Sequence, residues 1–161
     1  KIKLASIEDI ISYRLKNEKL IYRIATKTNL FNKLGKIQIY SYKNKLANNI
    51  NYAITKGKIN HKNSVPVRVI STKIKNNNIL LDIETRKNLK LLSRYKNFLL
   101  LIINNTNKIN NNINTLRYYG IGAQIIKDLK IKNMILISRT KKKIIGLEGF
   151  DLKIKKQIII K

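Results

Sequence analysis

An almost unbroken apolar run at Phe98–Ile103, FLLLII, limits the folds open to this chain more than any other feature. A strand with one side in water alternates apolar and polar residues, whereas this run has no polar side. Continuous apolar strands are typical of sheets that are covered on both faces. The run therefore predicts a strand that is buried on both faces of a sheet.

The segments around this run alternate between strand and helix patterns. Before it, an Asn-rich turn leads into a predicted strand at Ile79–Ile83, and Thr85–Lys96 has apolar residues at helical spacing. After it, we expect a flexible loop at Asn104–Asn114, a helix at Leu116–Leu129, a strand at Asn133–Ser138, a short helix at Lys141–Leu147 and a strand at Leu152–Ile160. This order predicts a three-layer α/β fold with a mixed, partly parallel sheet.

The N-terminal half predicts one helix and then short strands. Ser6 and Asp9 form a capping-box-like start for a helix at Ile7–Lys19. Pro66 suits the start or the edge of a strand, where a missing amide donor is harmless. The predicted strands are Leu20–Thr26, Lys36–Tyr42, Asn51–Thr55 and Val65–Ser71.

Length and hydropathy fit one domain. The 161 residues are enough for one core and too few for two ordinary domains. The chain begins at Lys1 rather than Met, and we expect it to be a piece of a longer protein. No apolar run approaches the length of a membrane span, and no cleavable secretion signal is visible.

The formal charge of +27 invites a nucleic-acid interpretation, because clustered Lys and Arg neutralise phosphates. However, Lys, Asn and Ile make up roughly half of the chain, as drift in a strongly AT-rich genome would produce. The cations are spread over almost every segment, without the interleaved aromatic residues of a stacking platform. We therefore do not expect specific nucleic-acid binding.

Cysteine is absent from the whole sequence, which removes disulfides, thiolate zinc ligands and cysteine nucleophiles together. His61 is the one histidine and lies in a Lys- and Asn-rich segment, where we expect a solvated side chain. The eight acidic residues are scattered, without the spacing of a transition-metal site. We expect no metal ion and no other cofactor.

Three blocks occur in order near the C-terminus: LRYYGIGAQII, MILIS and KKIIGLEGFDL. They resemble GTP cyclohydrolase II, the zinc enzyme that opens GTP at the start of riboflavin synthesis, whose members carry DLRDYGIGAQIL, LLTNNP and KIVGLEGYGL. Gly120 and Gly122 alone would be a weak signal, since glycine also permits close packing of a helix on a sheet. Three blocks in the family's order and spacing are a strong one, and they imply the cyclohydrolase II fold.

The resemblance extends to the N-terminus. KLASIEDIISYRLKNEKL is similar to the linker that follows 3,4-dihydroxy-2-butanone 4-phosphate synthase in bifunctional riboflavin enzymes. It implies a linker helix at residues 1–19 from a fused upstream synthase domain, and a cyclohydrolase II-like domain at residues 20–161. It also implies a homodimer without a membrane partner, in the cytoplasm of a bacterium or symbiont, with an organelle as the alternative.

The family's zinc ligands are missing from this sequence. In the family, a strand ending in RVHSEC supplies the first zinc cysteine, and a CDC pair completes the site. Lys73 stands at the first of these positions, and counting on without a gap places the pair at Glu84 and Arg86. Two cations and one carboxylate cannot replace thiolates, because cationic groups repel the metal ion. The resemblance thus implies a domain that has lost its zinc.

Other parts of the family's GTP pocket have also changed. Between Ile103 and Leu116 the family carries QEGRGIGL and a helix, which hold part of the triphosphate and the base, while this chain has only its Asn-rich segment. Thr115 replaces the acidic proton acceptor, and a hydroxyl cannot act as that base. GTP or another phosphate ligand is expected only if the pocket survives.

Five residues match family positions that contact the substrate. Arg117 matches the arginine that acts as nucleophile on the substrate phosphate, and it is equally consistent with a solvent-facing residue at the start of a helix. Chance retention explains Lys143, in a run of three lysines, as well as selection does. The matching substrate-binding positions are Arg68, Ser71, Ser138 and Lys143.

These observations favour a riboflavin-biosynthesis, GTP cyclohydrolase II-like domain that is catalytically degenerate. It would be retained as the structural C-terminal part of 3,4-dihydroxy-2-butanone 4-phosphate synthase. One alternative is residual GTP cyclohydrolase II activity, in which GTP is opened and formate and pyrophosphate are released. The other is a basic RNA-binding or ribosome-associated protein.

Overall fold

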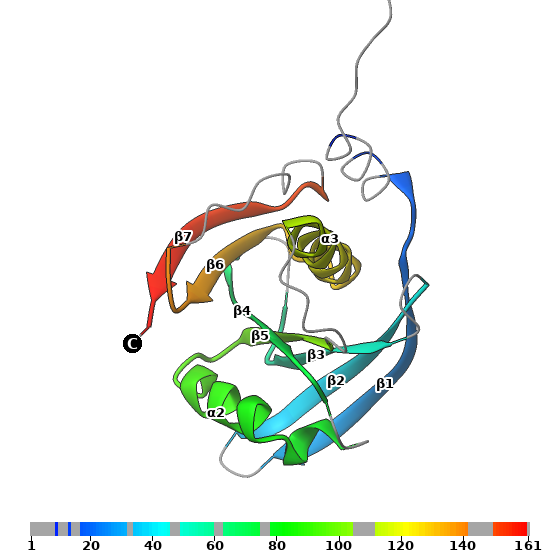
Figure 1. Ribbon diagram of the computed structural model, residues 1–161. Helices are drawn as coiled ribbons and strands as arrows, with labels where there is room; N and C mark the ends of the chain where they lie inside the picture. The colour runs from blue at the N-terminus through cyan, green and yellow to red at the C-terminus, as the bar shows by residue number, and fades with distance from the viewer. Residues whose placement is uncertain are drawn as a thin grey trace, which may run out of the picture.

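In the computed structural model, seven strands form one sheet in the order β1-β2-β3-β5-β4-β6-β7 (Figure 1). The structure describes residues 9, 13, 17–31, 34–45, 49–59, 63–74, 78–104, 112–141 and 150–160, without the side chains of 112–119. Among these residues, no helix combines the length and the apolar character that a membrane span requires.

One half of the sheet is antiparallel. Each strand in it pairs with the next in the order β1 (Ile21–Phe31), β2 (Gly35–Asn44), β3 (Ile50–Lys56) and β5 (Phe98–Asn104). The three strands predicted between residues 20 and 55 are confirmed, with β1 running on to Phe31. The apolar run therefore lies in the middle of the sheet, as predicted.

The other half is parallel. It consists of β5, β4 (Val65–Thr72), β6 (Asn133–Ser138) and β7 (Lys153–Ile159). Pro66 is the second residue of β4, just ahead of Val67, where the pairing with β5 begins, and it is in register with Ile135 of β6. The prediction of a mixed, partly parallel sheet is confirmed.

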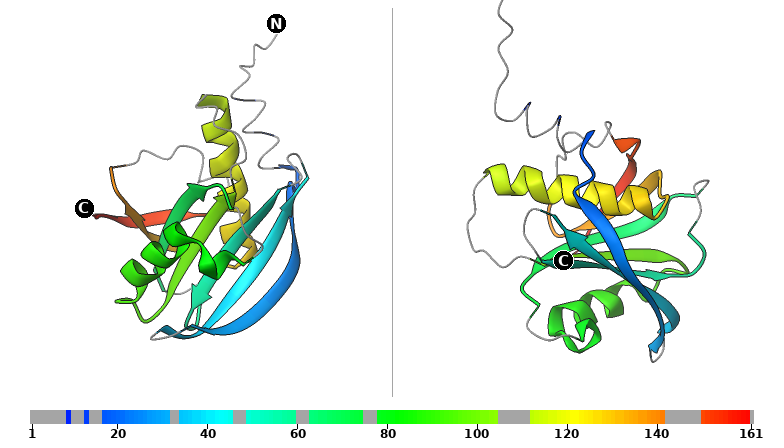
Figure 2. Two further views of the ribbon diagram at one scale, coloured as in Figure 1. Left: turned by 60° about the horizontal axis from the view of Figure 1, so that its bottom comes forward. Right: turned by 90° about the vertical axis from the view of Figure 1, so that its right-hand side faces the viewer.

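Two helices cover opposite faces of the sheet and complete three layers, as Figure 1 and Figure 2 show. α3 (Asn112–Asp128) lies on one face and α2 (Ile83–Leu92) on the other. β5 contributes to both cores, because Leu101 belongs to the α3-side core and Leu100 to the α2-side core. This double burial is what the FLLLII run predicts.

The strand predicted at Ile79–Ile83 is wrong. A short 3-10 turn, η2 (Ile79–Leu81), leads directly into α2. The side chain of Asn78 caps the turn, and the carboxylate of Asp82 accepts a hydrogen bond from the amide of Thr85 at 2.8 Å. Such caps satisfy amide donors that would otherwise be orphaned at a helix start.

Helix boundaries also differ from the predictions. α3 begins at Asn112, so the end of the loop predicted at Asn104–Asn114 is helical, and α2 ends at Leu92. The helix predicted at Ile7–Lys19 is described only at residues 9, 13 and 17–19, of which 9, 13 and 17 are helical. Most of the helix predicted at Lys141–Leu147 lies outside the described residues.

A cluster around Asp128 ties β1 and β2 to the end of α3. Arg23 donates to Oδ2 of Asp128 from Nε at 3.1 Å and from Nη2 at 2.6 Å, and its guanidinium lies 4.7 Å from the ring centre of Tyr40. The hydroxyl of Tyr42 donates to the same oxygen at 2.7 Å. A carboxylate at a helix C-terminus is unfavourable on its own, and these donors offset its charge.

This cluster predicts that the folded protein loses stability at alkaline pH. Burial, and then the hydrogen bond to Asp128, raise the pKa of Tyr42 above its usual value of about 10. The folded state thus favours the neutral phenol, so this contribution to stability is complete below about pH 10 and is lost as the pH rises towards the folded-state pKa. We expect denaturant unfolding to show a steeper stability loss between about pH 10 and 12 for the wild type than for Tyr42→Phe. Tyr22→Phe, which removes an exposed hydroxyl, should keep the wild-type slope, and equal slopes for all three proteins would contradict the assignment.

Candidate functional site

The carboxyl ends of the parallel strands form the candidate site. Open α/β sheets bind ligands where neighbouring connections leave towards opposite faces. Here β4 is followed by α2 on one face and β5 by α3 on the other, so this point falls between the ends of β4 and β5. Ser71 in β4 and Ser138 at the end of β6 lie along the same edge.

Three asparagines occupy the described part of this edge. Asn51 Oδ1 accepts from the amide of Asn104 at 3.0 Å, Asn104 Oδ1 accepts from the amide of Ile74 at 3.2 Å, and Asn49 Nδ2 donates to the carbonyl of Asn104. Oδ1 of Asn49 and Nδ2 of Asn51 are buried and have no hydrogen-bond partner among the described residues. Carboxamides can join strand ends, but they supply no acid, base or nucleophile. Sequence analysis missed this cluster, because asparagine is abundant throughout the chain.

Arg68 is the best-defined residue among those matched to the family, and it is buried, with 6% of its surface exposed. Its Nε donates to Oδ1 of Asn88 in α2 at 2.9 Å, and its Nη1 donates to the carbonyl of Ile137 in β6 at 3.0 Å. Burial lowers the pKa of Arg68, the nearby Arg139 lowers it further, and Glu84 opposes both effects. Since both hydrogen-bond partners are neutral, the side chain acts as a brace between β4, α2 and β6.

Asn88, the partner of Arg68, was also missed. It lies on the buried side of α2 with Thr85, Leu89 and Leu92. The three- and four-residue spacing of these positions is the signal that could have found it.

Arg68 and Ser71 lie on opposite faces of the sheet. β4 pairs with β5 without a register shift, so side chains three residues apart point to opposite sides. Arg68 faces α2, whereas Ser71 is exposed on the α3 side. Ser138 shares the α3 side, because Ile137 belongs to the α2-side core, and its Oγ donates to the carbonyl of Thr140 at 2.7 Å. The structure therefore does not bring Arg68 together with the two serines.

The remaining family-matched residues are placed only in part. Thr115 and Arg117 lie in α3, but their side chains are outside the described set. Lys143 and His61 lie outside the described residues altogether. Their predicted roles stay predictions.

The three positions matched to zinc cysteines do not form a metal site. Lys73 is exposed after β4, while Glu84 and Arg86 are two residues apart in α2, where side chains point to different sides. Glu84 Oε1 pairs with Lys87 Nζ at 3.5 Å, and Arg86 Nε donates to the carbonyl of Leu80 at 2.8 Å. In the described part of the chain, no three Asp, Glu or His side chains gather as metal ligands. This donor set does not fit a zinc ion.

The family model for GTP cyclohydrolase II matches residues 79–159, just over half of the chain. The chain therefore belongs to the GTP cyclohydrolase II family, and the predicted resemblance is confirmed.

Its curated relatives are riboflavin biosynthesis proteins and synthases. The riboflavin biosynthesis protein RibBA of Aquifex aeolicus is 29% identical over 99% of this chain and 47% of its own length. The 3,4-dihydroxy-2-butanone 4-phosphate synthase of Sulfurospirillum multivorans is 34% identical over 95% of this chain and 42% of its own length. The chain thus spans less than half the length of these relatives.

A solved structure has the same fold. It is RibBX, a two-domain 3,4-dihydroxy-2-butanone 4-phosphate synthase from A. baumannii, with a TM-score of 0.66 and 21% identity. The match covers 96% of this chain and 44% of that protein.

Proposed function

We propose that this domain keeps the cyclohydrolase II fold without the GTP ring-opening reaction, and serves as the structural C-terminal part of a 3,4-dihydroxy-2-butanone 4-phosphate synthase. The observation that carries the proposal is the absence of cysteine from all 161 residues. Lys73, Glu84 and Arg86 cannot replace three thiolates, because two of them are cations. The domain thus has no ligand set for the family's zinc ion.

The rest of the pocket supports the same proposal. Thr115 provides no carboxylate to accept a proton, which leaves Arg117 without the base that accompanies it in the family. Arg68 is engaged by Asn88 and Ile137, on the face opposite Ser71. Stabilising a developing charge requires donors that are preorganised around one point, and these residues are divided between two faces.

The alignment with the Sulfurospirillum synthase needs fewer gaps than the alignment with the Aquifex protein. The match to the Aquifex protein runs over 191 positions, although this chain has 161 residues, so that protein carries segments which this chain lacks. The match to the Sulfurospirillum synthase runs over 159 positions for 95% of the chain, which leaves room for few gaps. The trimmed form of the domain thus resembles a protein named for the synthase reaction alone.

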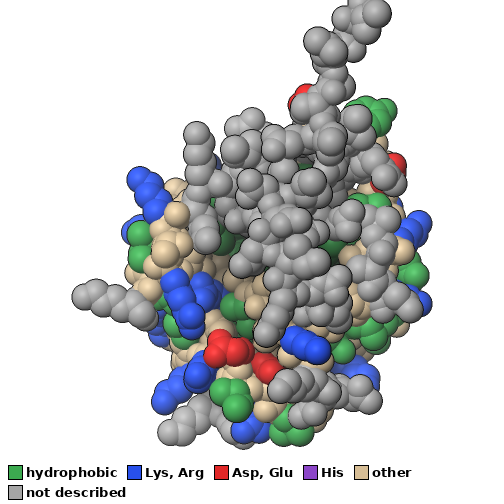
Figure 3. Space-filling view, in the orientation of Figure 1, with side chains coloured by type: hydrophobic (Ala, Val, Ile, Leu, Met, Phe, Trp, Pro, Cys, Tyr) green, Lys and Arg blue, Asp and Glu red, His purple; other side chains and the backbone are tan. Residues whose placement is uncertain are grey.

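The basic surface favours no nucleic-acid function. Among the described residues, Figure 3 shows Lys and Arg side chains at several separate places on the visible face, with Asp and Glu side chains beside some of them. Nucleic-acid modules instead gather cations along a groove with aromatic stacking platforms. The charge of +27 is therefore not assigned to an RNA ligand.

The proposal predicts no release of formate from GTP. The purified chain, loaded with zinc in excess and dialysed, should contain well under one zinc per chain by elemental analysis. It should also leave GTP intact in a coupled formate assay. A cyclohydrolase II with its three cysteines, treated in parallel, serves as the positive control. Chelator-sensitive formate release by this chain would overturn the proposal.

The structural role needs a separate measurement on the full-length protein. We expect it to form 3,4-dihydroxy-2-butanone 4-phosphate, and we expect a version that ends before residue 20 to lose activity faster on heating while keeping its initial rate. Equal inactivation half-lives of the full-length and the shortened protein would contradict the structural role. They would not be evidence for the cyclohydrolase reaction.

A further inference from the structure

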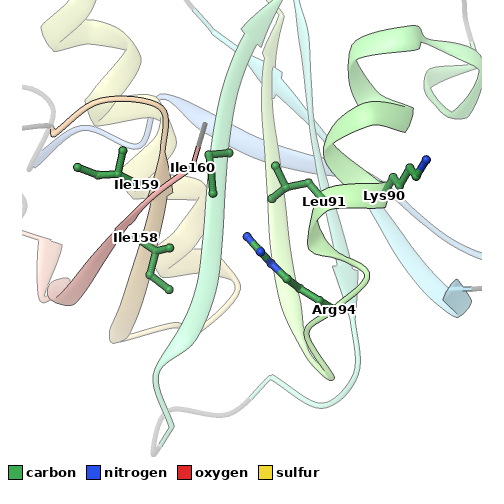
Figure 4. A pocket seen from close by; sticks show the side chains of 6 residues that line it. All are labelled: Lys90, Leu91, Arg94, Ile158, Ile159 and Ile160. Atoms are coloured by element: carbon green, nitrogen blue, oxygen red, sulfur yellow. The ribbon is translucent and has the colours of Figure 1, made fainter.

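An open groove of about 530 Å³ lies between α2 and β7, away from the strand ends described above. Figure 4 shows Lys90 and Leu91 of α2 on one side, with Arg94 in the turn after the helix, and the end of β7 on the other side. The β7 side is lined by Ile158, Ile159 and Ile160.

The groove lies where α2 stops short of the edge of the sheet. α2 packs on β5, near the centre of the sheet, while β6 and β7 lie beyond it at the edge. Ile158 and Ile160 are half-buried residues at the margin of the α2-side core, whereas Ile159 between them points to the other face of the strand. Apolar side chains therefore continue past the helix that should cover them.

Arg94 brings a positive charge to this groove. Arg94 lies in the turn after α2, with its guanidinium carbon 5.3 Å from the ring centre of Tyr95. In Figure 4 this guanidinium points towards β7, whereas Lys90 of α2 points outwards. Neither cation forms an ion pair with the acidic residues that the structure describes. A ligand that fits this groove combines apolar groups with negative charge.

We propose that this groove binds an acidic amphipathic helix of a partner protein. A helix lying beside α2 would cover β6 and β7, placing apolar side chains on Leu91, Ile158 and Ile160 and carboxylates next to Arg94 and Lys90. This is the helix-in-groove mode of recognition, in which an apolar stripe enters and charged flanks fix the orientation. A second copy of the chain is a poor occupant, because it carries +27 and would bring further lysines against Arg94.

The proposal is tested with three synthetic helical peptides and the intact chain. One peptide carries leucines at i, i+3, i+4 and i+7 with glutamates on both flanks. The second has the same composition in scrambled order, and the third has lysines in place of the glutamates. Fluorescence anisotropy should show saturable binding of the first peptide and at least about tenfold weaker binding of the other two.

Two substitutions locate the site. Arg94→Glu, at an exposed position, should weaken binding of the first peptide by about tenfold or more, because it replaces attraction with repulsion. Ile158→Asp should do the same, with circular dichroism to verify that it folds. Lys36→Glu is the matched control: it makes the same charge change at an exposed residue of β2, which four strands separate from β7 in the sheet.

Each alternative gives a different result. If Lys36→Glu weakens binding as much as Arg94→Glu, the chain attracts acidic peptides only by its overall charge, and the proposal is wrong. If the scrambled peptide binds equally well, no apolar stripe is recognised. Self-association in sedimentation experiments that Ile158→Asp abolishes would assign the groove to a second copy instead.

Discussion

Replacing Leu101 with alanine is expected to lower the free energy of unfolding by roughly 3–5 kcal/mol. Leu101 is fully buried in β5, on the face that α3 covers. α3 approaches it closely: a Cβ added to Gly122 would lie 3.4 Å from Cδ2 of Leu101. Truncation therefore loses apolar burial and leaves a cavity that β5, held by a strand on each side, cannot collapse to fill.

Chemical denaturation with the midpoint and slope fitted together measures this loss. The matched control is Leu30→Ala in β1, where the side chain is 84% exposed and the change should stay within about 0.5 kcal/mol. If both variants unfold at the same denaturant concentration, β5 is not the centre of the core.

The layered architecture could be predicted because it follows from local pattern. Phe98–Ile103 has no polar side, and only a strand between two covering layers tolerates that. Asn133–Ser138 was predicted with its observed bounds for the same reason, since polar residues at both ends limit a short apolar run. Such patterns need no knowledge of which strands become neighbours.

Short apolar runs with capping residues could not be assigned in this way. Ile79–Ile83 has the composition of a strand, and length alone does not separate a strand from a helical turn. The outcome depends on Asn78 and Asp82, whose side chains bind backbone amides two and three residues further on. Asn and Asp are so common around turns that their presence did not identify these caps.

At the candidate site, the sequence predicts which residues match the family but not to which face of the sheet they point. The sequence identified Arg68 and Ser71 as matches to one family strand, but not that their side chains would serve different faces. The partners of Arg68 come from α2 and β6, at sequence separations of 20 and 69 residues. Contacts at such separations follow from the packing of layers, which no local pattern encodes.

Gly57→Ala is expected to lower the free energy of unfolding by roughly 3 kcal/mol or more, which is the second large effect. Gly57 follows β3 with φ at 71°, a left-handed conformation that an L side chain adopts only with strain. An added Cβ would lie 2.7 Å from the carbonyl oxygen of Lys96 and 3.1 Å from Cβ of Asn97. That segment cannot move aside, because the next residue, Phe98, is fully buried and pairs with Lys56 of β3.

A second variant, Gly35→Ala, separates the backbone strain at positive φ from the steric contact of the added Cβ. Gly35 has nearly the same φ, 73°, but nothing lies within 4 Å of its added Cβ, so only the conformational strain of roughly 1–2 kcal/mol should remain. Denaturant unfolding should therefore give a clearly lower free energy of unfolding for Gly57→Ala than for Gly35→Ala. Equal losses would mean that the Lys96–Asn97 backbone yields to the methyl group, and that the contact between the end of β3 and the start of β5 is looser than the distances indicate. A larger loss at Gly57 would show that this junction fixes where the central strand β5 enters the sheet.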